Sequence, residues 1–416
     1  MPKKKIYLDY AATTPVSKEV LKEMLPFFSE KFGNAMSVHS FGQEALEAVD
    51  LARERVANFF GAQIGEIIFA SGATEANNLA IKGLIKSYYA DPKNKIKPHI
   101  ITTIFEHHCV LNACKAVEKE NLAEITYLPI GKDGIINPTQ LKKAIKKNTI
   151  LISVMYVNNE IGTVQPIETI GKIIQKIRQS KTEGKTLYPL FHTDAAQAIN
   201  YFDCDVKKLG VDLLSMSAHK IYGPKGVGVL YIKKGTPIKH IQDGGDQEFK
   251  MRAGTHNVPG IVGLGKAIEL INSQLATLPT GRQARNSQRI LKLRNYLIKK
   301  VLKEISKAYL NGSKIKRSPN NASFRFDNVE GEGLLLSLDI EGIAVSTGSA
   351  CSSGALEPSH VLLALGLKHE QAHGSLRVTL GKETTKKEID FFIKKLKEII
   401  QRLRKISGGV LKDFNS

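Results

Sequence analysis

An acidic residue and a lysine close two apolar runs in the middle of the chain. Asp194 ends the run LYPLFHTD, and Lys220 ends the run LLSMSAHK. A buried carboxylate needs a cationic partner, and a buried lysine can have its pKa lowered enough to act as an amine nucleophile. The pair therefore predicts a site where an amine attacks a carbonyl group beside a carboxylate. Taken alone, Lys220 would be interpreted as a surface lysine.

A run of small residues, Ser71 to Thr74, leads from an apolar segment into a stretch rich in alanine and asparagine. Backbone N–H groups and the positive end of a helix dipole bind phosphate at such a start, and the Thr74 hydroxyl adds a donor. Alone, the run is typical of an ordinary helix cap. With Asp194 and Lys220 it completes the set that pyridoxal 5'-phosphate requires, namely an amine for the aldehyde, an acid for the pyridine nitrogen and dipoles for the phosphate.

Histidine and cysteine residues suggest further roles. His107 and His108 follow a β-branched run, so one imidazole could lie against a planar cofactor ring. Cys351 stands among small residues in STGSACSSG, a setting that favours an exposed thiolate on a mobile loop. The alternative to these roles is a metal site, although the short helical spacing of zinc motifs is missing. That site would use His39, His107, His192 and His219.

The elements that must position these residues alternate between β-branched runs and amphipathic stretches, which predicts an α/β fold. Helices are expected at 18–28, 43–60, 74–87, 110–119, 139–146 and 167–180. Strands are expected at 66–70, 100–104, 150–156, 188–193, 213–217 and 228–232. The polar clusters SGATEANN, FEHH, YVNNE, TDAAQ and SAHK each follow a strand. Ligands of open α/β sheets bind beyond the carboxyl ends of the strands, so one shared pocket is predicted.

The last third of the chain has a different pattern and predicts a smaller second domain. A long helical stretch over 259–303 leads into it, and a helix over 382–405 with one apolar face closes it. Strands are expected at 322–326, 343–346 and 375–378. We therefore expect a large domain over residues 16–262, a small domain over 263–416, and a segment over 1–15 that packs with the small domain.

Composition excludes several classes of protein. The 416 residues are 42% hydrophobic and 24% charged, as in globular proteins, and no apolar run approaches the roughly 20 residues that cross a bilayer. The net charge of +20 would suit nucleic acid or acidic proteins, but no nucleic-acid motif accompanies it, and DNA binding is not expected. Four cysteines without metal-ligand or disulfide spacing favour the cytoplasm.

Eight motifs in order carry a resemblance to a known family. They are LDYAATTP, SGATEANNLAIKG, EHH, VNNEIG, DAAQ, SAHKIYGPKG, MRAGT and GSACSSG. The chain resembles the cysteine desulfurases of the IscS/NifS type, in the class V aminotransferase-like branch of fold-type I pyridoxal phosphate enzymes. The resemblance implies a mainly parallel seven-stranded sheet flanked by helices and a smaller α+β C-terminal domain.

The resemblance also implies a role for each matching residue. Lys220 binds the cofactor covalently, Asp194 holds the pyridine nitrogen, and His107 stacks on the ring. The remaining cofactor contacts are implied for Gln197, Ala73, Thr74, Asn158, Ser217, His219 and, from the second subunit of a homodimer, Thr255. The substrate carboxylate is implied to bind Asn158 and Arg377. Cys351 takes the sulfur of L-cysteine as a persulfide, and L-alanine is left.

The implied acceptors of that sulfur are an iron–sulfur scaffold protein and sulfur carriers, with tRNA thiolation as a second use. No resident metal is implied, although Cys351 could contact an iron–sulfur cluster in passing. The alternatives are a selenocysteine lyase, a class V aminotransferase and a non-enzymatic scaffold. The thiol of Cys351 argues against an aminotransferase, which needs no thiol. Two departures from the family pattern, Ala35 and Asp246, predict an altered rate or substrate access.

Overall fold

A seven-stranded sheet forms the centre of the computed structural model, which describes residues 5–180, 187–276, 285–347 and 358–413. The strand order is β2-β8-β7-β6-β5-β3-β4. β8 runs antiparallel to both its neighbours, and the other pairs are parallel. The strands are β2 (Ile67–Ala70), β3 (His99–Thr103), β4 (Glu124–Leu128), β5 (Thr149–Ser153), β6 (Leu190–Asp194), β7 (Leu213–Ser217) and β8 (Gly228–Ile232).

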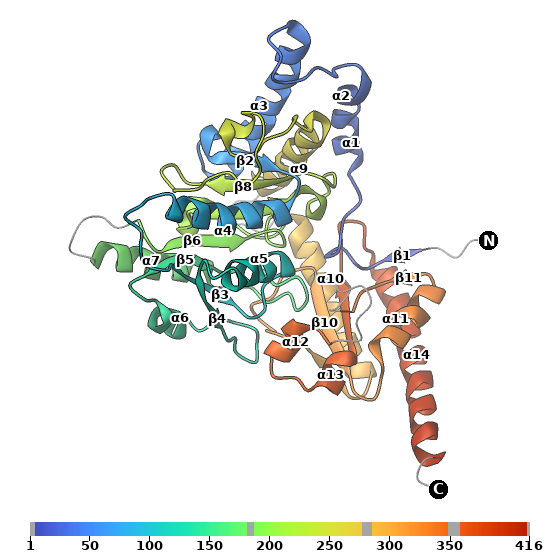
Figure 1. Cartoon of the computed structure of the whole chain (residues 1–416). Coiled ribbons are helices and arrows are strands. Elements are labelled where there is room, and N and C mark those ends of the chain that lie inside the picture. The colour runs from blue at the N-terminus through green and yellow to red at the C-terminus, as the bar shows by residue number, and fades with distance from the viewer. Residues whose placement is uncertain (1–4, 181–186, 277–284, 348–357, 414–416) are drawn as a thin grey trace.

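Helices cover both faces of this sheet, which is why its strands read as nearly continuous apolar runs (Figure 1). In β2, Ile67 and Phe69 pack into one core, and Ile68 and Ala70 pack into the other. One face carries α4 (Ala73–Tyr89) and α5 (His108–Lys119). The other carries α1 (Lys18–Met24), α3 (Ser40–Phe60), α6 (Pro138–Ala144), α7 (Ile167–Ser180), α8 (Val206–Leu209) and α9 (Val258–Ala276).

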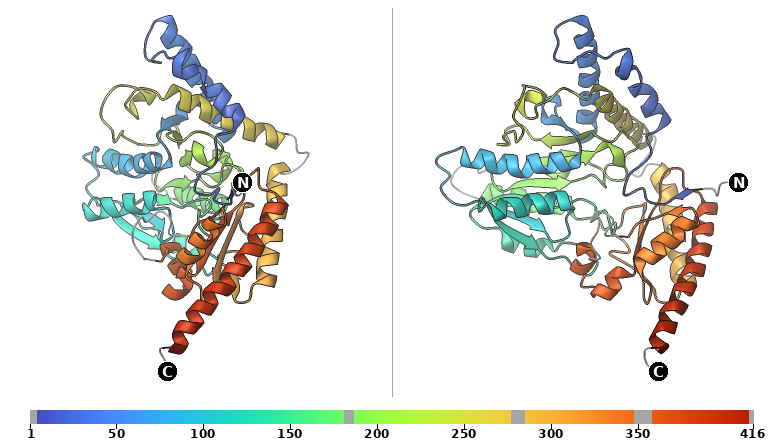
Figure 2. Two further views of the ribbon diagram at one scale, coloured as in Figure 1. Left: turned by 90° about the vertical axis from the view of Figure 1, so that its right-hand side faces the viewer. Right: turned by 45° about the vertical axis from the view of Figure 1, so that its right-hand side comes forward.

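A smaller part with its own core follows. Its antiparallel sheet is formed by β9 (Ala308–Leu310), β10 (Asn321–Phe326) and β12 (Ser375–Thr379). β1 (Ile6–Tyr7) pairs in parallel with β11 (Ile343–Ala344), so that Ile6 and Leu8 enter the small core. The helices are α10 (Arg285–Glu304), α11 (Gly331–Ile340), α12 (His360–Ala364), α13 (His369–His373) and α14 (Lys386–Asp413). Figure 2 shows α14 extending beyond the rest of this part.

The fold class predicted from the sequence is confirmed, but several boundaries differ. The helix expected over 18–28 is divided into α1 and α2 (Pro26–Ser29), because Pro26 has no N–H to continue the ladder. β4 was not predicted. The helix expected from residue 382 begins at Lys386, because Thr385 and Glu388 form a reciprocal cap there. The strand expected at 343–346 is reduced to the two residues of β11.

The helical stretch expected over 259–303 contains two helices that pack against different cores. α9 contributes apolar residues to the core of the large sheet as far as Ile271. In α10, Ile290, Leu297 and Val301 belong to the small core. We therefore propose that the division between the two parts lies between α9 and α10 rather than at residue 262.

Candidate active site

A cavity of about 570 Å³ lies at the carboxyl ends of the central strands, where the sequence predicted a shared pocket. Each of the five polar clusters contributes at least one residue to its wall. Nine of the predicted site residues line it, namely Ala73, Thr74, His107, Asp194, Gln197, Ser217, His219, Lys220 and Arg377. The prediction of one pocket is confirmed.

One end of the cavity is built to receive an anion. α4 begins there after Gly72, and within the described residues no side chain caps its first turn. The N–H groups of Ala73 and Thr74 therefore face the cavity at the positive end of a helix dipole. Ser217 lies close by, since a Cβ added to Gly72 would stand 3.7 Å from its hydroxyl oxygen. This end fits a phosphate group.

His219 adds a neutral side chain to the same wall. Its Nδ1 lies 3.1 Å from the Thr13 hydroxyl. Burial, with the positive charges of Lys220 and Lys225, lowers the pKa of His219 to about 4. The ring is therefore uncharged at neutral pH and can serve as a hydrogen-bond partner to an anion without adding a charge of its own.

Lys220 follows the end of β7 and is the last residue of the short helix η2 (Ala218–Lys220). Its Nζ donates to the carbonyl oxygens of Ala11 at 2.6 Å and Ala12 at 2.7 Å. Gln197 donates to the same Ala11 carbonyl at 2.9 Å. The segment that follows β1 thus holds both side chains at the wall of the cavity, where an aldehyde could reach the amine.

Asp194 is the last residue of β6 and is nearly buried. The backbone N–H of Ala196 donates to Oδ1 at 2.9 Å, and the Asn77 amide donates to Oδ2 at 2.8 Å. Two donors stabilise the carboxylate where burial alone would be costly. Asn77 was not predicted as a site residue. It could have been found from its position on the first turns of α4, on the side that faces β6.

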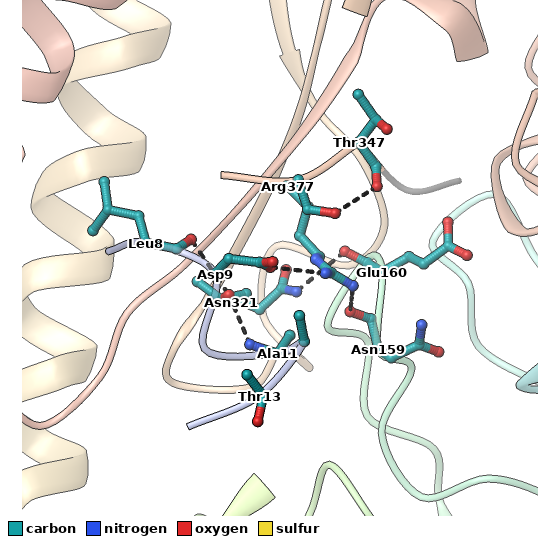
Figure 3. A network of polar contacts seen from close by, with 12 residues as sticks. Leu8, Asp9, Ala11, Thr13, Asn159, Glu160, Asn321, Thr347 and Arg377 are labelled. Atoms are coloured by element: carbon teal, nitrogen blue, oxygen red, sulfur yellow. Dashed lines mark hydrogen bonds and ion pairs between the residues drawn. The ribbon is translucent and has the colours of Figure 1, made fainter. Parts of the chain in front are cut away.

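Arg377 of β12 brings a guanidinium from the small part to the cavity (Figure 3). Its Nη2 lies 2.9 Å from Oδ1 of Asp9, and Nη1 donates to the Asn159 carbonyl at 3.0 Å. Its Nε is buried with no hydrogen-bond partner among the residues that the structure describes. A substrate carboxylate fits this guanidinium, because a planar fork of N–H donors binds such a group in two-point fashion.

Two of the predicted residues, Asn158 and Thr255, do not line the cavity. Asn158 is buried and closes its own turn: it donates to the Phe105 carbonyl and accepts from Glu160 and Ile161 N–H groups. Its neighbour Asn159 lines the cavity instead. Thr255 is exposed on the loop before α9. Cys351 lies outside the described residues.

A buried ion network anchors the loop that carries Thr255. Arg53 of α3 makes two hydrogen bonds to the Glu248 carboxylate, at 2.7 and 2.8 Å. The His256 ring lies 3.0 Å from the same carboxylate, and Phe69 N–H donates to it. Residues 248–250 all have positive φ, so this turn depends on its anchors.

Replacing Glu248 with alanine would leave Arg53 as an unpaired buried charge. We expect the free energy of unfolding to fall by about 3–5 kcal/mol, as measured by denaturant titration with circular dichroism. The control is Glu44→Ala, which breaks the exposed pair with Lys31 and should cost under about 1 kcal/mol. Equal losses in the two variants would contradict a stabilising role for the buried network.

Taken together, the cavity fits pyridoxal phosphate. An uncapped helix start and two polar side chains suit its phosphate, the Lys220 amine suits its aldehyde, and the Asp194 carboxylate suits its pyridine nitrogen. The metal alternative is not supported by the placement of its histidines. His192 is buried between Ser153 and Ser215, and His39 caps α3. Among the described residues, no three His, Cys, Asp or Glu side chains gather as metal ligands.

Comparison with known proteins places the chain in a family. Residues 6–392 match the model of the class-V aminotransferases. A cysteine desulfurase IscS of Dictyoglomus turgidum is 52% identical over 405 residues, which are 97% of each chain. One of Methanosarcina thermophila is 47% identical over 99% of this chain and 96% of its own.

Solved structures agree with this placement. A NifS-like protein superposes with a TM-score of 0.85 at 37% identity, over 96% of this chain and all of its own. The structure of SspA in complex with cysteine superposes with a TM-score of 0.76, also at 37% identity, over 92% of this chain and all of its own. None of the described helices combines the length and apolar character needed to cross a membrane. This chain belongs to the class-V aminotransferase family and, within it, to the cysteine desulfurases of the IscS type.

Proposed function

We propose that this chain takes sulfur from L-cysteine as a persulfide on Cys351 and leaves L-alanine. The observation that carries the proposal is the cavity itself, where an amine, a buried carboxylate, a phosphate cradle and a guanidinium meet. The amine, carboxylate and cradle suit pyridoxal phosphate, the cofactor of this family, and the guanidinium suits the carboxylate of an amino acid.

Each of the residues that line the cavity has a separate role in the proposed reaction. When bound, pyridoxal phosphate draws electrons from the substrate Cα, so that the proton there becomes acidic. Asp194 would stabilise the positive charge of the pyridine nitrogen, because two donors keep its carboxylate ionised. Lys220 would hold the cofactor through its aldehyde, and its amine, once released, would move a proton at Cα. Arg377 orients the substrate through its carboxylate.

Cys351 completes the transfer. Its thiolate attacks the substrate sulfur, so that a sulfur–sulfur bond forms while the carbon–sulfur bond of the substrate breaks. The electron pair of the broken bond stays on the carbon, which takes up a proton. Cα then regains the proton that it lost, and the product is alanine. A thiol is required because thiolates attack sulfur readily and hydroxyl groups do not. The persulfide then passes to an acceptor, for which we propose an iron–sulfur scaffold or a sulfur carrier, with tRNA thiolation as a second route.

We also propose a homodimer in which Thr255 completes the phosphate site of the other subunit. Its exposed position on an anchored loop, outside the cavity of its own chain, supports this. Large apolar side chains are also exposed on the α1–α3 segment, which is unusual for a monomer; they include Leu25, Phe28, Phe32, Val38 and Phe41. Light scattering should give twice the chain mass of 45.8 kDa. A mass near that of one chain would contradict the role of Thr255.

The cytoplasm is the compartment that we propose, because Cys109, Cys114 and Cys204 are buried as free thiols. The basic surface charge would favour acidic acceptor proteins.

The function is tested by supplying purified protein with L-cysteine, pyridoxal phosphate and a thiol reductant. Alanine and sulfide should form in equal amounts, since each turnover splits one cysteine. Sulfide without alanine would contradict the proposal. If a protein that binds the cofactor formed neither product, cysteine would not be the substrate. Selenocysteine would then be tested in the same assay.

A further inference from the structure

The side chain of His107 is engaged at the start of α5. His107 is the N-cap of that helix, and its Nδ1 accepts the backbone N–H of Cys109 at 3.3 Å. The Cys109 sulfur lies 2.9 Å from the same Nδ1. Both contacts use one ring nitrogen, and the described residues provide no hydrogen-bond partner for the other, Nε2, in a ring that lines the cavity.

These contacts restrict where the ring proton can be. A backbone N–H can only donate, so Nδ1 must present a lone pair to it. The positive end of α5 also opposes a charged imidazolium at the N-cap. A neutral ring with a lone pair on Nδ1 carries its proton on Nε2.

The thiol of Cys109 reinforces the same arrangement. The Asn77 amide donates to the sulfur at 3.0 Å, so the sulfur acts as an acceptor there. Its own proton can go to Nδ1 of His107 at 2.9 Å or to Asp194 at 3.9 Å, and the nearer partner is favoured. Asn77 also donates to Asp194, so one amide connects the carboxylate with the thiol.

We propose that Cys109 is a positioning residue that holds His107 as the neutral tautomer with its proton on Nε2. The inference rests on the proposed function, because it assigns His107 a role in that reaction. In this form His107 offers a donor to groups in the cavity and no lone pair, since its lone pair is occupied by Cys109. The removal of the Cα proton is therefore left to Lys220.

The electrostatic surroundings agree with this assignment. Burial raises the pKa of the Cys109 thiol, as does the nearby charge of Asp194, so the sulfur keeps its proton. Burial lowers the pKa of His107, so the ring stays neutral. The titratable groups that face the ring are Asp194 of β6, Lys220 of η2, His108 of α5 and His360 of α12.

Nitrogen NMR of protein labelled with ¹⁵N-histidine tests the tautomer, with the His107→Gln variant to assign the signal. At pH 7.5, without substrate and with or without pyridoxal phosphate, Nδ1 should have the shift of an unprotonated nitrogen and Nε2 that of a protonated one. A proton on Nδ1, or a charged ring at this pH, would overturn the inference. This readout does not depend on turnover, so it is separate from the test of the function.

Variants at Cys109 test the contribution of its thiol. In Cys109→Ala the backbone donor remains but the side-chain donor is lost, so the pKa of His107 should rise by about 0.5 to 1 pH unit. The acid limb of the pH profile of kcat should move upward by the same amount. Cys109→Ser keeps a donor and should restore the wild-type values, and Cys114→Ala, a buried thiol on the same helix, should not change them. An unchanged His107 in Cys109→Ala would overturn the role of the thiol. Cys109→Val, which also lacks a side-chain donor but fills more of the space, serves the same test if the alanine variant does not fold.

Discussion

Replacing Lys220 with alanine is expected to abolish alanine formation and the visible absorbance of protein-bound pyridoxal phosphate. The amine is the group that binds the aldehyde and later moves the Cα proton, so the variant loses both functions at once. Loss of a proton-transfer group alone costs about 10²- to 10⁴-fold in rate. The absorbance of the purified protein and alanine formed from L-cysteine are measured side by side.

The matched control is Lys207→Ala, because Lys207 is exposed on α8 away from the cavity walls. It should keep both the absorbance and the activity. An unchanged visible band in Lys220→Ala would remove this lysine from the cofactor site, whatever the activity of the variant.

Replacing Cys351 with serine should stop sulfide release while the bound cofactor still changes colour on addition of L-cysteine. The colour change reports substrate binding, which uses Lys220 and Arg377, whereas sulfur transfer needs a thiolate. Loss of a covalent nucleophile should lower turnover at least ~100-fold. Absorbance after mixing and sulfide in the same sample separate the two steps.

Cys204→Ala controls for the loss of a thiol in general, since Cys204 is buried in the large core and should leave turnover intact. Full sulfide release by Cys351→Ser would exclude this residue from the transfer. Loss of the colour change as well would mean that the substitution had disturbed substrate binding.

The strands that position the site could be predicted because they are buried on both sides. β6 and β7 are apolar runs that end at Asp194 and at the segment before Lys220, so both strand and polar end are visible in the sequence. β4 was missed because it is an edge strand with an exposed Glu124 and two half-buried residues, a weaker pattern. The division of the stretch 259–303 between two cores was missed because both α9 and α10 have helical periodicity.

The residues that line the cavity were harder to predict than the clusters that contain them. The choice between Asn158 and Asn159 depends on which amide closes the turn, and two adjacent asparagines look alike in sequence. The sequence shows Cys109 only as part of an apolar helix pattern, because its contact with His107 depends on how α5 begins. Arg377 was predicted through the resemblance alone, since no local pattern shows that a side chain of β12 lines the cavity.

The pairing of β1 with β11 determines the order in which the protein can be completed during synthesis. Ile6 leaves the ribosome about 340 residues before Ile343, which at about 5–20 residues per second is a delay on the order of 20 to 70 s. The large sheet can form in that interval, whereas the small core must wait for its partners from the end of the chain. The nascent chain therefore acquires its cavity in two stages, and Arg377 of β12 joins the cavity wall in the second.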